Sequence, residues 1–565
     1  MKQLLAHFDR ISDAPDTIPR LRQFILELAV RGKLVDRDAN DEPASQLLKR
    51  IHAEKDRRNK NGQIKKQEAL PQVRPDEAWF GVPGSWHWVR LGTITQVLMG
   101  QSPPGETYNK TGEGIPLING PVEFTEGPFG KTVVNQYTTA PTNLCEEGDL
   151  LLCVRGSTTG RTNIAGFRAC IGRGVAAIRP FFADQYVRLF IWRLRESIIA
   201  MGRGIAFPSV SRQQIEGLPV PLPPLAEQHR IVAKVDELMA LCDRLEAAQA
   251  ERENRRDRLA AVSLHGLNQL AATDEPEVFR EHARFYLNQL PRLTTRPDQI
   301  KQIRQTILSL AVRGKLATQN PNDEPVSLLL DRIQTEKARL LKAGKIRGQE
   351  LPSVVRDDIP IDLPQSWEWV PLARVLCSSF YGPRFGADEY CATGIPTIRT
   401  TDMTVDGRIV LRDPPRVSVP VDRLDDFKCE KGDLLITRTG SIGTMAVFGG
   451  GYEAIPSAYL IRLRFSASTR VDYIHVVLRS PYGQAALGLN TTKVAQPNIN
   501  AKNLSAILIP LPPLAEQNRI VTKVEELMLL CDQLETQLKT IQTENRRLLE
   551  SVLHEALAPA ALQTL

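Results

Sequence analysis

At 565 residues the chain is too long for one hydrophobic core, so we expect roughly three to five structural units. A hydrophobic content of 42%, a charged content of 24% and the lack of any apolar run of about 18 residues exclude a chain built from membrane-spanning helices. The net charge of +7 is modest for this length, so its distribution is more informative than its size. The first residues contain no apolar export segment and the eight cysteines form no CxxC pair, which predicts a cytoplasmic protein with reduced, buried thiols.

Two helices are predicted near the start of the chain, within residues 17–70. Apolar residues recur at helical spacing from Leu21 to Ala29, and Gly32 can end this helix. Residues 297–350 repeat the pattern, and the segment LAVRGKL occurs in both places, at Leu28–Leu34 and Leu310–Leu316. Such a repeat predicts one structural unit that the chain uses twice.

Each helical segment leads, through a Pro-rich linker, into a longer and more divergent insert. Two aromatic residues at i and i+2 open both inserts and predict a strand edge, at Gly84–Leu91 and Gln365–Leu372. Short apolar runs separated by Gly, Pro and Asn predict an α/β or α+β globule with many short strands. Both inserts also contain a Gly-Asp-Leu-Leu strand followed by a basic loop of Gly, Ser and Thr, at Gly148–Gly160 and Gly432–Gly443.

A long helix is predicted after each insert, just past the sequence PLPP, which cannot remain helical. The 20 residues from Glu227 and from Glu516 share 15 identities, and their apolar residues are spaced alternately four and three apart, as in a coiled coil. We expect the two helices to pair with each other as a rod of about 60 Å, at about 1.5 Å per residue. The alternative is that each helix covers only its own insert. The predicted seam residues are Ile231, Val235, Leu238, Cys242 and Leu245 in the first helix and Ile520, Val524, Leu527, Cys531, Leu534, Leu538 and Ile541 in the second.

Basic charge is concentrated in the two inserts. Residues 155–212 contain ten arginines and two acids, and residues 434–504 contain seven basic residues and two acids. This distribution predicts a polyanion as the ligand, and surface salt bridges are the alternative. Arg462 and Arg464 alternate with apolar residues and are expected on a solvated strand face.

Motifs of catalysis are not evident in the sequence. We find no P-loop, no Gly-rich cofactor loop behind a strand, no HExxH and no Cys/His cluster at zinc spacing. Asp413–Arg416 comes nearest to the Asn/Asp-Pro-Pro-aromatic tetrad of amino-methyltransferases but lacks the aromatic residue. We therefore expect a binding protein with no catalytic residue and no metal site, rather than an enzyme.

The blocks LAVRGKL with NDEP, GDLL-x-x-x-x-GS and PLPPLAEQ-x-RIV-x-KV-x-ELM occur in this order in both halves. Together they resemble the DNA specificity subunit of type I restriction-modification systems. The resemblance implies an α+β fold with two α/β target recognition domains, separated by a long antiparallel two-helix coiled coil and related by internal pseudo-twofold symmetry. The implied segments are a helical conserved region (1–84), a first recognition domain (85–219), a central conserved region (220–364), a second recognition domain (365–508) and a C-terminal conserved helix (509–565).

The resemblance also implies a function. Each recognition domain reads one half of an asymmetric bipartite target in double-stranded DNA, and the coiled coil sets the spacer. The conserved helices dock two modification (methyltransferase) subunits, to which restriction (translocase and endonuclease) subunits are added. S-adenosylmethionine, ATP and Mg²⁺ are expected on those partner subunits, and no cofactor is expected in this chain.

Three loops of each insert offer side chains suited to DNA, because Arg pairs with guanine, Asn and Gln with adenine, and small polar residues with phosphate. For every one of these side chains, a role in a turn or in the fold is the alternative. The residues expected to contact DNA are Gln101, Tyr108, Arg155, Ser157, Thr158, Thr159, Arg161, Arg203, Ser209, Ser211 and Arg212 in the first insert and Arg384, Arg438, Thr439, Ser441, Lys493, Gln496, Asn498 and Asn500 in the second.

Two other functions stay open on the sequence alone. One is a self-contained methyltransferase or nuclease, which the missing cofactor motifs disfavour. The other is a stand-alone DNA-binding scaffold or regulator with a coiled coil. A methyltransferase gene beside this one would distinguish the specificity subunit from the regulator.

Overall fold

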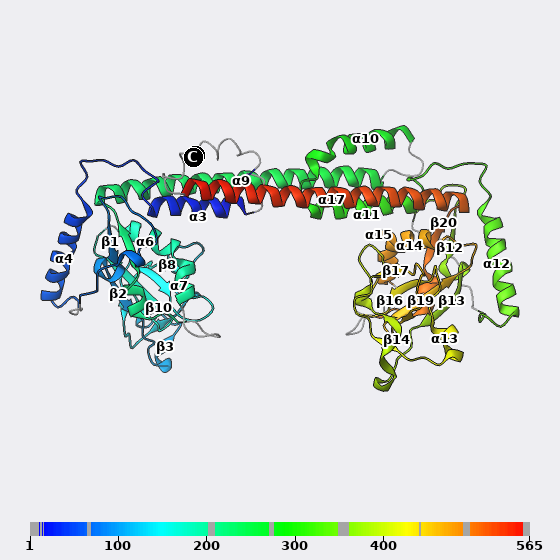
Figure 1. Ribbon diagram of the computed structural model, residues 1–565, viewed down its shortest axis with the longest axis horizontal. Coiled ribbons are helices and arrows are strands. Elements are labelled where there is room, and N and C mark those ends of the chain that lie inside the picture. Colours follow the sequence, from blue (N-terminus) through cyan, green and yellow to red (C-terminus); the bar gives the residue numbers. More distant parts are fainter. Residues whose placement is uncertain are drawn as a thin grey trace. The chain divides into compact units, whose positions relative to one another are not determined.

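The structure is a computed structural model that describes residues 11, 14, 16–64, 69–182, 184–201, 209–269, 276–348, 361–439, 442–489 and 498–557. It consists of mixed helices and sheets and divides into two compact units (Figure 1). Unit 1 comprises Met1–Glu251 and Gln542–Leu565, and unit 2 comprises Arg252–Ile541. None of the described helices is long and apolar enough to cross a membrane.

Unit 1 contains the first helical segment, the first insert and the last part of α17 (Leu514–Leu557). Its elements are, in chain order, α3 (Thr17–Val30), α4 (Ala44–Lys60), η1 (Pro75–Glu77), β1 (His87–Arg90), α5 (Leu91–Ile94), β2 (Thr95–Met99), η2 (Gly105–Thr107), β3 (Tyr108–Asn109), β4 (Ile115–Ile118), β5 (Tyr137–Thr138), β6 (Leu144–Cys145), β7 (Leu150–Cys153), β8 (Thr162–Ile164), β9 (Ala169–Ile171), β10 (Val175–Pro180), α6 (Asp184–Arg193), α7 (Arg195–Met201), α8 (Arg212–Glu216), β11 (Pro219–Leu222) and the first part of α9 (Leu225–Gln269).

The core of unit 1 is a four-stranded antiparallel sheet in the order β2-β10-β7-β8. Successive side chains of a strand point to opposite faces. Leu150 and Leu152 of β7 pack against α4, α6 and α7, whereas Leu151 and Cys153 pack against the five-stranded sheet β3-β5-β4-β9-β6. Both faces of β7 are therefore buried, which explains its unbroken apolar sequence.

Unit 2 contains the second helical segment and the second insert. Its elements are the last part of α9, α10 (Pro276–Leu293), α11 (Pro297–Val312), α12 (Val326–Lys342), β12 (Glu368–Pro371), η4 (Leu372–Arg374), β13 (Leu376–Tyr381), η5 (Ala387–Glu389), β14 (Tyr390–Ile398), η6 (Thr400–Asp402), β15 (Arg416–Val417), α13 (Val421–Phe427), β16 (Leu434–Thr437), β17 (Met445–Val447), β18 (Ile455–Pro456), β19 (Leu460–Phe465), α14 (Val471–Arg479), α15 (Pro481–Leu489), α16 (Ala501–Ala506), β20 (Leu508–Leu511) and the first part of α17 (Leu514–Leu557).

The sheets of unit 2 repeat those of unit 1 in the parts that hold the loops. The four-stranded sheet β13-β19-β16-β17 has the strand order and the antiparallel pairing of β2-β10-β7-β8. In each unit the first and last strands of the insert pair with each other, β1 with β11 and β12 with β20. The prolines of the PLPP exits are tolerated there because these are isolated two-stranded sheets with open edges.

The predicted seam residues face a short helix of their own unit. In unit 1 the seam of α9 packs against Ile18, Ile25 and Leu26 of α3, and in unit 2 the seam of α17 shares one core with Ile300, Ile307 and Leu308 of α11. The sequence therefore indicated the apolar seam of each long helix but not the helix that covers it. That partner is α3 in unit 1 and α11 in unit 2, each of which has an apolar face of its own. Ile541 is 51% exposed, so its assignment to the seam was wrong.

The expected helices and strands are present at most of the predicted places. Gly32 and Gly314 end α3 and α11 with φ of 64° and 70°, and a Cβ on Gly32 would lie 2.8 Å from the ring of Pro83. The predicted thiols are unpaired, and Cys242 and Cys531 are buried. Helix α10 was not predicted, and its cluster with the end of α9 adds a contact that unit 1 does not show in its described residues. The division into five segments stays a prediction.

A buried glutamate at the start of each long helix ties that helix to the neighbouring insert. Trp86 Nε1 donates to Glu227 Oε2 at 2.9 Å, and Glu227 Oε1 is buried without a partner among the described residues. In unit 2, Trp367 lies close to Glu516 without a hydrogen bond of good geometry, and both Glu516 carboxyl oxygens lack a described partner. Burial raises the pKa of both carboxyls above their ordinary value of 4.5.

The change Glu516→Gln is therefore expected to stabilise the chain increasingly as the pH rises. A carboxyl with a raised folded pKa contributes stability below 4.5 and loses it as the pH rises through that raised pKa. An amide does not ionise, so the variant does not lose stability in this way. The difference between the unfolding free energies of the variant and the parent should therefore increase in favour of the variant between about pH 4 and pH 8. Chemical denaturation across that range measures the difference. Glu526→Gln, an exposed position on the same helix, is the control, and equal pH profiles for the two variants would contradict the prediction.

Candidate nucleic-acid interface

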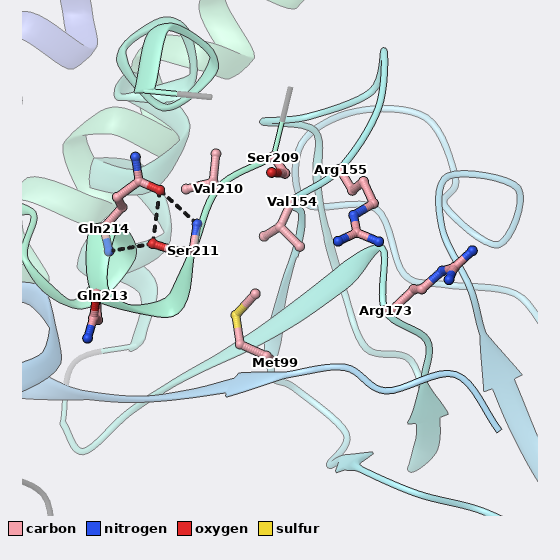
Figure 2. A pocket seen from close by; sticks show the side chains of 9 residues that line it. All are labelled: Met99, Val154, Arg155, Arg173, Ser209, Val210, Ser211, Gln213 and Gln214. Carbon is pink, nitrogen blue, oxygen red and sulfur yellow. Dashed lines mark hydrogen bonds between the residues drawn. The ribbon is translucent and has the colours of Figure 1, made fainter. Parts of the chain in front are cut away.

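Two of the three predicted loops of unit 1 meet the end of the opening strand at one cavity of about 550 Å³ (Figure 2). Met99 ends β2, just before the predicted loop that contains Gln101 and Tyr108, and Arg155 follows β7. The remaining lining residues come from the segment 209–211 before α8 and from α8 itself. A backbone bridge joins Arg155 to Ser209, and Val210 N donates to Val154 O at 2.9 Å. The sheet thus holds segments that are far apart in the sequence around one opening.

The lining of this cavity is apolar at its centre and polar at its sides. Figure 2 shows Arg155 and Arg173 on one side, the hydrogen-bonded pair Ser211 and Gln214 on the other, and Met99 between them. Ser211 is the N-cap of α8, because its Oγ accepts from Gln214 N at 3.3 Å. A planar group with polar edges suits such a lining.

The arginines of the basic segment of unit 1 fall into two groups. Five are ion-paired with acids: Arg168, Arg179, Arg188, Arg193 and Arg212. Arg155 and Arg173 are exposed and form no ion pair with any residue that the structure describes. The salt-bridge alternative therefore accounts for half of the ten arginines and leaves the two cavity arginines available for an anion or a base edge.

In unit 2 the corresponding loops meet around Arg438. Its guanidinium lies 4.9 Å from the ring centre of Tyr381, and its Nε donates to Asn498 Oδ1 at 3.3 Å. Ala501 N donates to the Tyr381 hydroxyl at 2.8 Å, which fixes the ring. Arg438 is half-buried and bound to neutral partners, so its charge is not cancelled by an acid in the described residues.

Arg462 and Arg464 do not lie on a solvated face, which corrects the expectation for this strand. Both pair with Asp433, at 3.8 Å and 2.7 Å, and Arg462 is 5% exposed. Burial and the neighbouring charge of Arg464 lower the pKa of the Arg462 guanidinium. For Arg464 burial is the largest single influence and acts in the same direction, but the hydrogen bond to Asp433 and the charges of Asp433 and Glu430 together outweigh it, and the pKa is raised. The three-stranded sheet β15-β14-β18 covers this face of β19, which the alternating sequence could not reveal.

Comparison with known proteins shows the family of the chain. Residues 83–253 and 374–542, together more than half of the chain, match the profile of the type I restriction modification DNA specificity domain. The chain is 31% identical over 96% of its length to the type I restriction enzyme EcoAI specificity subunit of Escherichia coli, covering 94% of that protein. Identity and coverage are the same for the EcoEI specificity subunit of Escherichia coli.

The chain belongs to the type I restriction-modification specificity subunit family. A solved structure from a study of complex assembly and conformational transition of the type I system aligns with 85% of this chain and 99% of its own, at 19% identity and a TM-score of 0.50. That likeness supports the fold.

Several predicted DNA contacts of this specificity subunit are engaged within the fold. Tyr108 donates its hydroxyl to Pro103 O, Thr159 donates to Gly156 O, and Arg161 lies against Phe124. Arg212 pairs with Glu216, and Asn500 caps α16. Thr158 is half-buried in the turn after Arg155, next to Cys153. These side chains position the loops, and their contact with DNA stays a prediction.

The remaining predicted contacts fall into three groups. Some lie at the loop junction of each unit, where the loop after β7 or β16 meets the segment before α8 or α16. Others lie elsewhere on the surface, and the rest are outside the described residues. Arg155, Ser209 and Ser211 line the cavity of unit 1, and Arg438, Thr439 and Asn498 meet in unit 2. Gln101, Ser157 and Arg384 are exposed. Arg203, Ser441, Lys493 and Gln496 lie outside the described residues. The backbone bridges and the helix caps place Ser209 and Ser211 of unit 1 at the positions of Asn498 and Asn500 in unit 2.

Sequence reasoning missed Arg173, Met99 and Tyr381 as residues of the two junctions. Arg173 stands between two glycines that separate β9 from β10, and its backbone N donates to Ser102 Oγ at 3.2 Å. The sequence feature that could have identified Arg173 as a candidate contact is a single arginine between two glycines at a turn between strands. Its proximity to Arg155 could not be read from positions that lie 18 residues apart.

Proposed function

We propose that this specificity subunit reads an asymmetric bipartite target in double-stranded DNA, one half-site with each unit. The observation that carries the proposal is the repeated loop junction. In each unit the loops meet on a four-stranded sheet with the same strand order. Each junction also contains arginines without an acid partner in the described residues, Arg155 and Arg173 in unit 1 and Arg438 in unit 2. Because the side chains at the two junctions differ, the two half-sites should differ as well.

We also propose that α9 and α17 pair antiparallel, with the two units related by a pseudo-twofold axis. In each unit the short helix is ion-paired with both long helices. Arg22 of α3 pairs with Asp243 of α9, and Arg20 pairs with Glu550 of α17. In unit 2, Arg304 of α11 pairs with Asp532 of α17, and Arg296 pairs with Asp257 of α9. Each unit therefore contains the start of one long helix and the end of the other, as an antiparallel pair requires.

The partners follow from the same proposal. The conserved helices dock two modification subunits, which bind S-adenosylmethionine, and restriction subunits add ATP- and Mg²⁺-dependent steps. This chain supplies no catalytic residue, so methyl transfer occurs only when a modification subunit is bound.

Co-expression with the modification subunit tests this function. A stable complex is expected that methylates DNA at one bipartite sequence, with the observed binding constant falling linearly against salt on a logarithmic scale, at a slope of about −0.9 per phosphate contact. A chain that stays alone and binds DNA would favour the regulator. Methyl transfer by the isolated chain would favour a self-contained enzyme.

Lengthening the long helices should change the spacer alone. Seven extra residues in each helix, between Glu251 and Arg252 and between Ile541 and Gln542, keep the seam in register and extend the rod by about 10 Å. At about 3.4 Å per base pair this is about three base pairs. Sequencing of the methylated sites should show both half-sites unchanged around a longer spacer. Changed bases in either half-site would contradict the proposed role of the rod.

A further inference from the structure

The backbone around the loop junction forms the same hydrogen bonds in both units. Val154 N donates to Gly174 O at 2.9 Å, and Arg438 N donates to Tyr459 O at 2.8 Å. The segments that precede α8 and α16 are bound in the same way, since Val210 N donates to Val154 O and Ile499 N donates to Arg438 O. These bonds define equivalent positions that the divergent sequences do not show.

Six equivalent positions surround the junction, and the side chain differs at every one. The pairs are Met99 and Tyr381, Val154 and Arg438, Arg155 and Thr439, Arg173 and Ala458, Gly174 and Tyr459, and Ser209 and Asn498. The ion pair behind the junction is kept, as Arg179 with Asp149 and as Arg464 with Asp433. Two domains that recognise different DNA sequences would need this combination, with the same backbone framework and different side chains at the contact positions.

In unit 1 the backbones of both free arginines are held firmly at the cavity. A Cβ on Gly172 would lie 2.1 Å from the side-chain oxygen of Asn119, so the turn that carries Arg173 is closely packed against Asn119. Arg155 is fixed by its bridge to Ser209. Two guanidinium groups on fixed backbones, beside the buried Val154, form a donor-rich opening of about 550 Å³.

Among the described residues of the unit 2 junction there is one arginine, and it stands at a different position from those of unit 1. Arg438 stands where unit 1 has Val154, and its orientation is set by the ring of Tyr381 and by Asn498. Tyr459, which is 60% exposed, stands where unit 1 has Gly174. In unit 2 an aromatic surface and one oriented guanidinium group therefore take the place of the two arginines of unit 1.

We propose that base discrimination resides in these exchanged side chains, with Arg155 and Arg173 each donating to a guanine of one half-site and Arg438 donating to a guanine of the other. Guanine fits because its O6 and N7 accept a bidentate guanidinium, the commonest specific contact of arginine with DNA. The inference rests on the proposed function that each unit reads one half-site.

The test replaces each arginine of unit 1 with the residue that unit 2 carries at the same position, in the full complex with the modification subunit. The variants are Arg155→Thr and Arg173→Ala, and both side chains are exposed, so the fold should keep its thermal midpoint. Arg168→Ala is the matched control, because it removes the same charge from an exposed ion pair of unit 1. Methylation is measured on a duplex library that varies every base pair of both half-sites.

Each cavity variant should lose roughly 10- to 100-fold of its preference for guanine at one position of one half-site and keep the other half-site intact. The control should keep its full preference at every position. Equal weakening on all sequences, with preference retained, would show that the arginines contact phosphates and would overturn the inference while the proposed function stands. If the unaltered complex has no sequence preference, the proposed function itself fails.

Discussion

Replacing Asp433 with Ala is expected to destabilise unit 2 by about 3–5 kcal/mol, because the buried Arg462 loses its counter-charge and the half-buried Arg464 keeps only the more exposed Glu430. Asp433 is 1% exposed, pairs with Arg464 at 2.7 Å and lies 3.8 Å from Arg462. A loss of this size is a large share of the stability of an ordinary domain, about 5–15 kcal/mol. Chemical denaturation of the full chain, followed by a probe in unit 2, measures it.

Two controls separate this effect from simple loss of an ion pair. Asp472→Ala breaks the exposed pair with Arg470 and should cost at most about 1 kcal/mol. Asp149→Ala in unit 1 leaves one arginine, Arg179, without its acid, so a smaller loss than for Asp433→Ala is expected. If Asp433→Ala and Asp472→Ala were equally stable, the buried cluster would not support unit 2 as described.

Replacing Arg438 with Ala should relax the target in one half-site. The side chain is held by Tyr381 and Asn498, so little freedom is lost when it binds a base, and its removal should cost about 1–3 kcal/mol of discrimination at one base pair. Site-resolved methylation by the full complex measures this cost.

Two further variants show how that result is to be read. Arg470→Ala removes the same charge from unit 2 and should leave the preference unchanged. Tyr381→Phe keeps the ring but loses the hydroxyl that accepts from Ala501 N, so it should have a smaller effect than Arg438→Ala. A uniform loss across all sequences for Arg438→Ala would instead indicate a phosphate contact.

Local periodicity was sufficient to predict the helices and the strands that open and close each insert. The apolar spacing and the glycine at Gly32 give the end of α3 at Val30, and the PLPP exit gives the start of α9 at Leu225. These features depend on neighbours in the sequence. The partner of the α9 seam, helix α3, could not be read in this way because about 200 residues separate them.

The candidate interface shows the same division. The loop containing Arg155 was found because a basic, glycine-rich segment follows an apolar strand. Whether an arginine is free or paired depends on acids that are distant in the sequence, as Glu27 is for Arg193 and Asp433 is for Arg462. The equivalence of Val154 with Arg438 likewise needed the backbone hydrogen bonds, since the intervening loops differ in length.

Exchanging the first insert, residues 85–219, for that of another specificity subunit and sequencing the methylated sites in cells tests most directly whether each unit reads its own half-site. Only one half of the methylated target should change, while the other half and the spacer length stay the same. A change in both halves, or an unchanged target, would contradict the reading of one half-site by each unit.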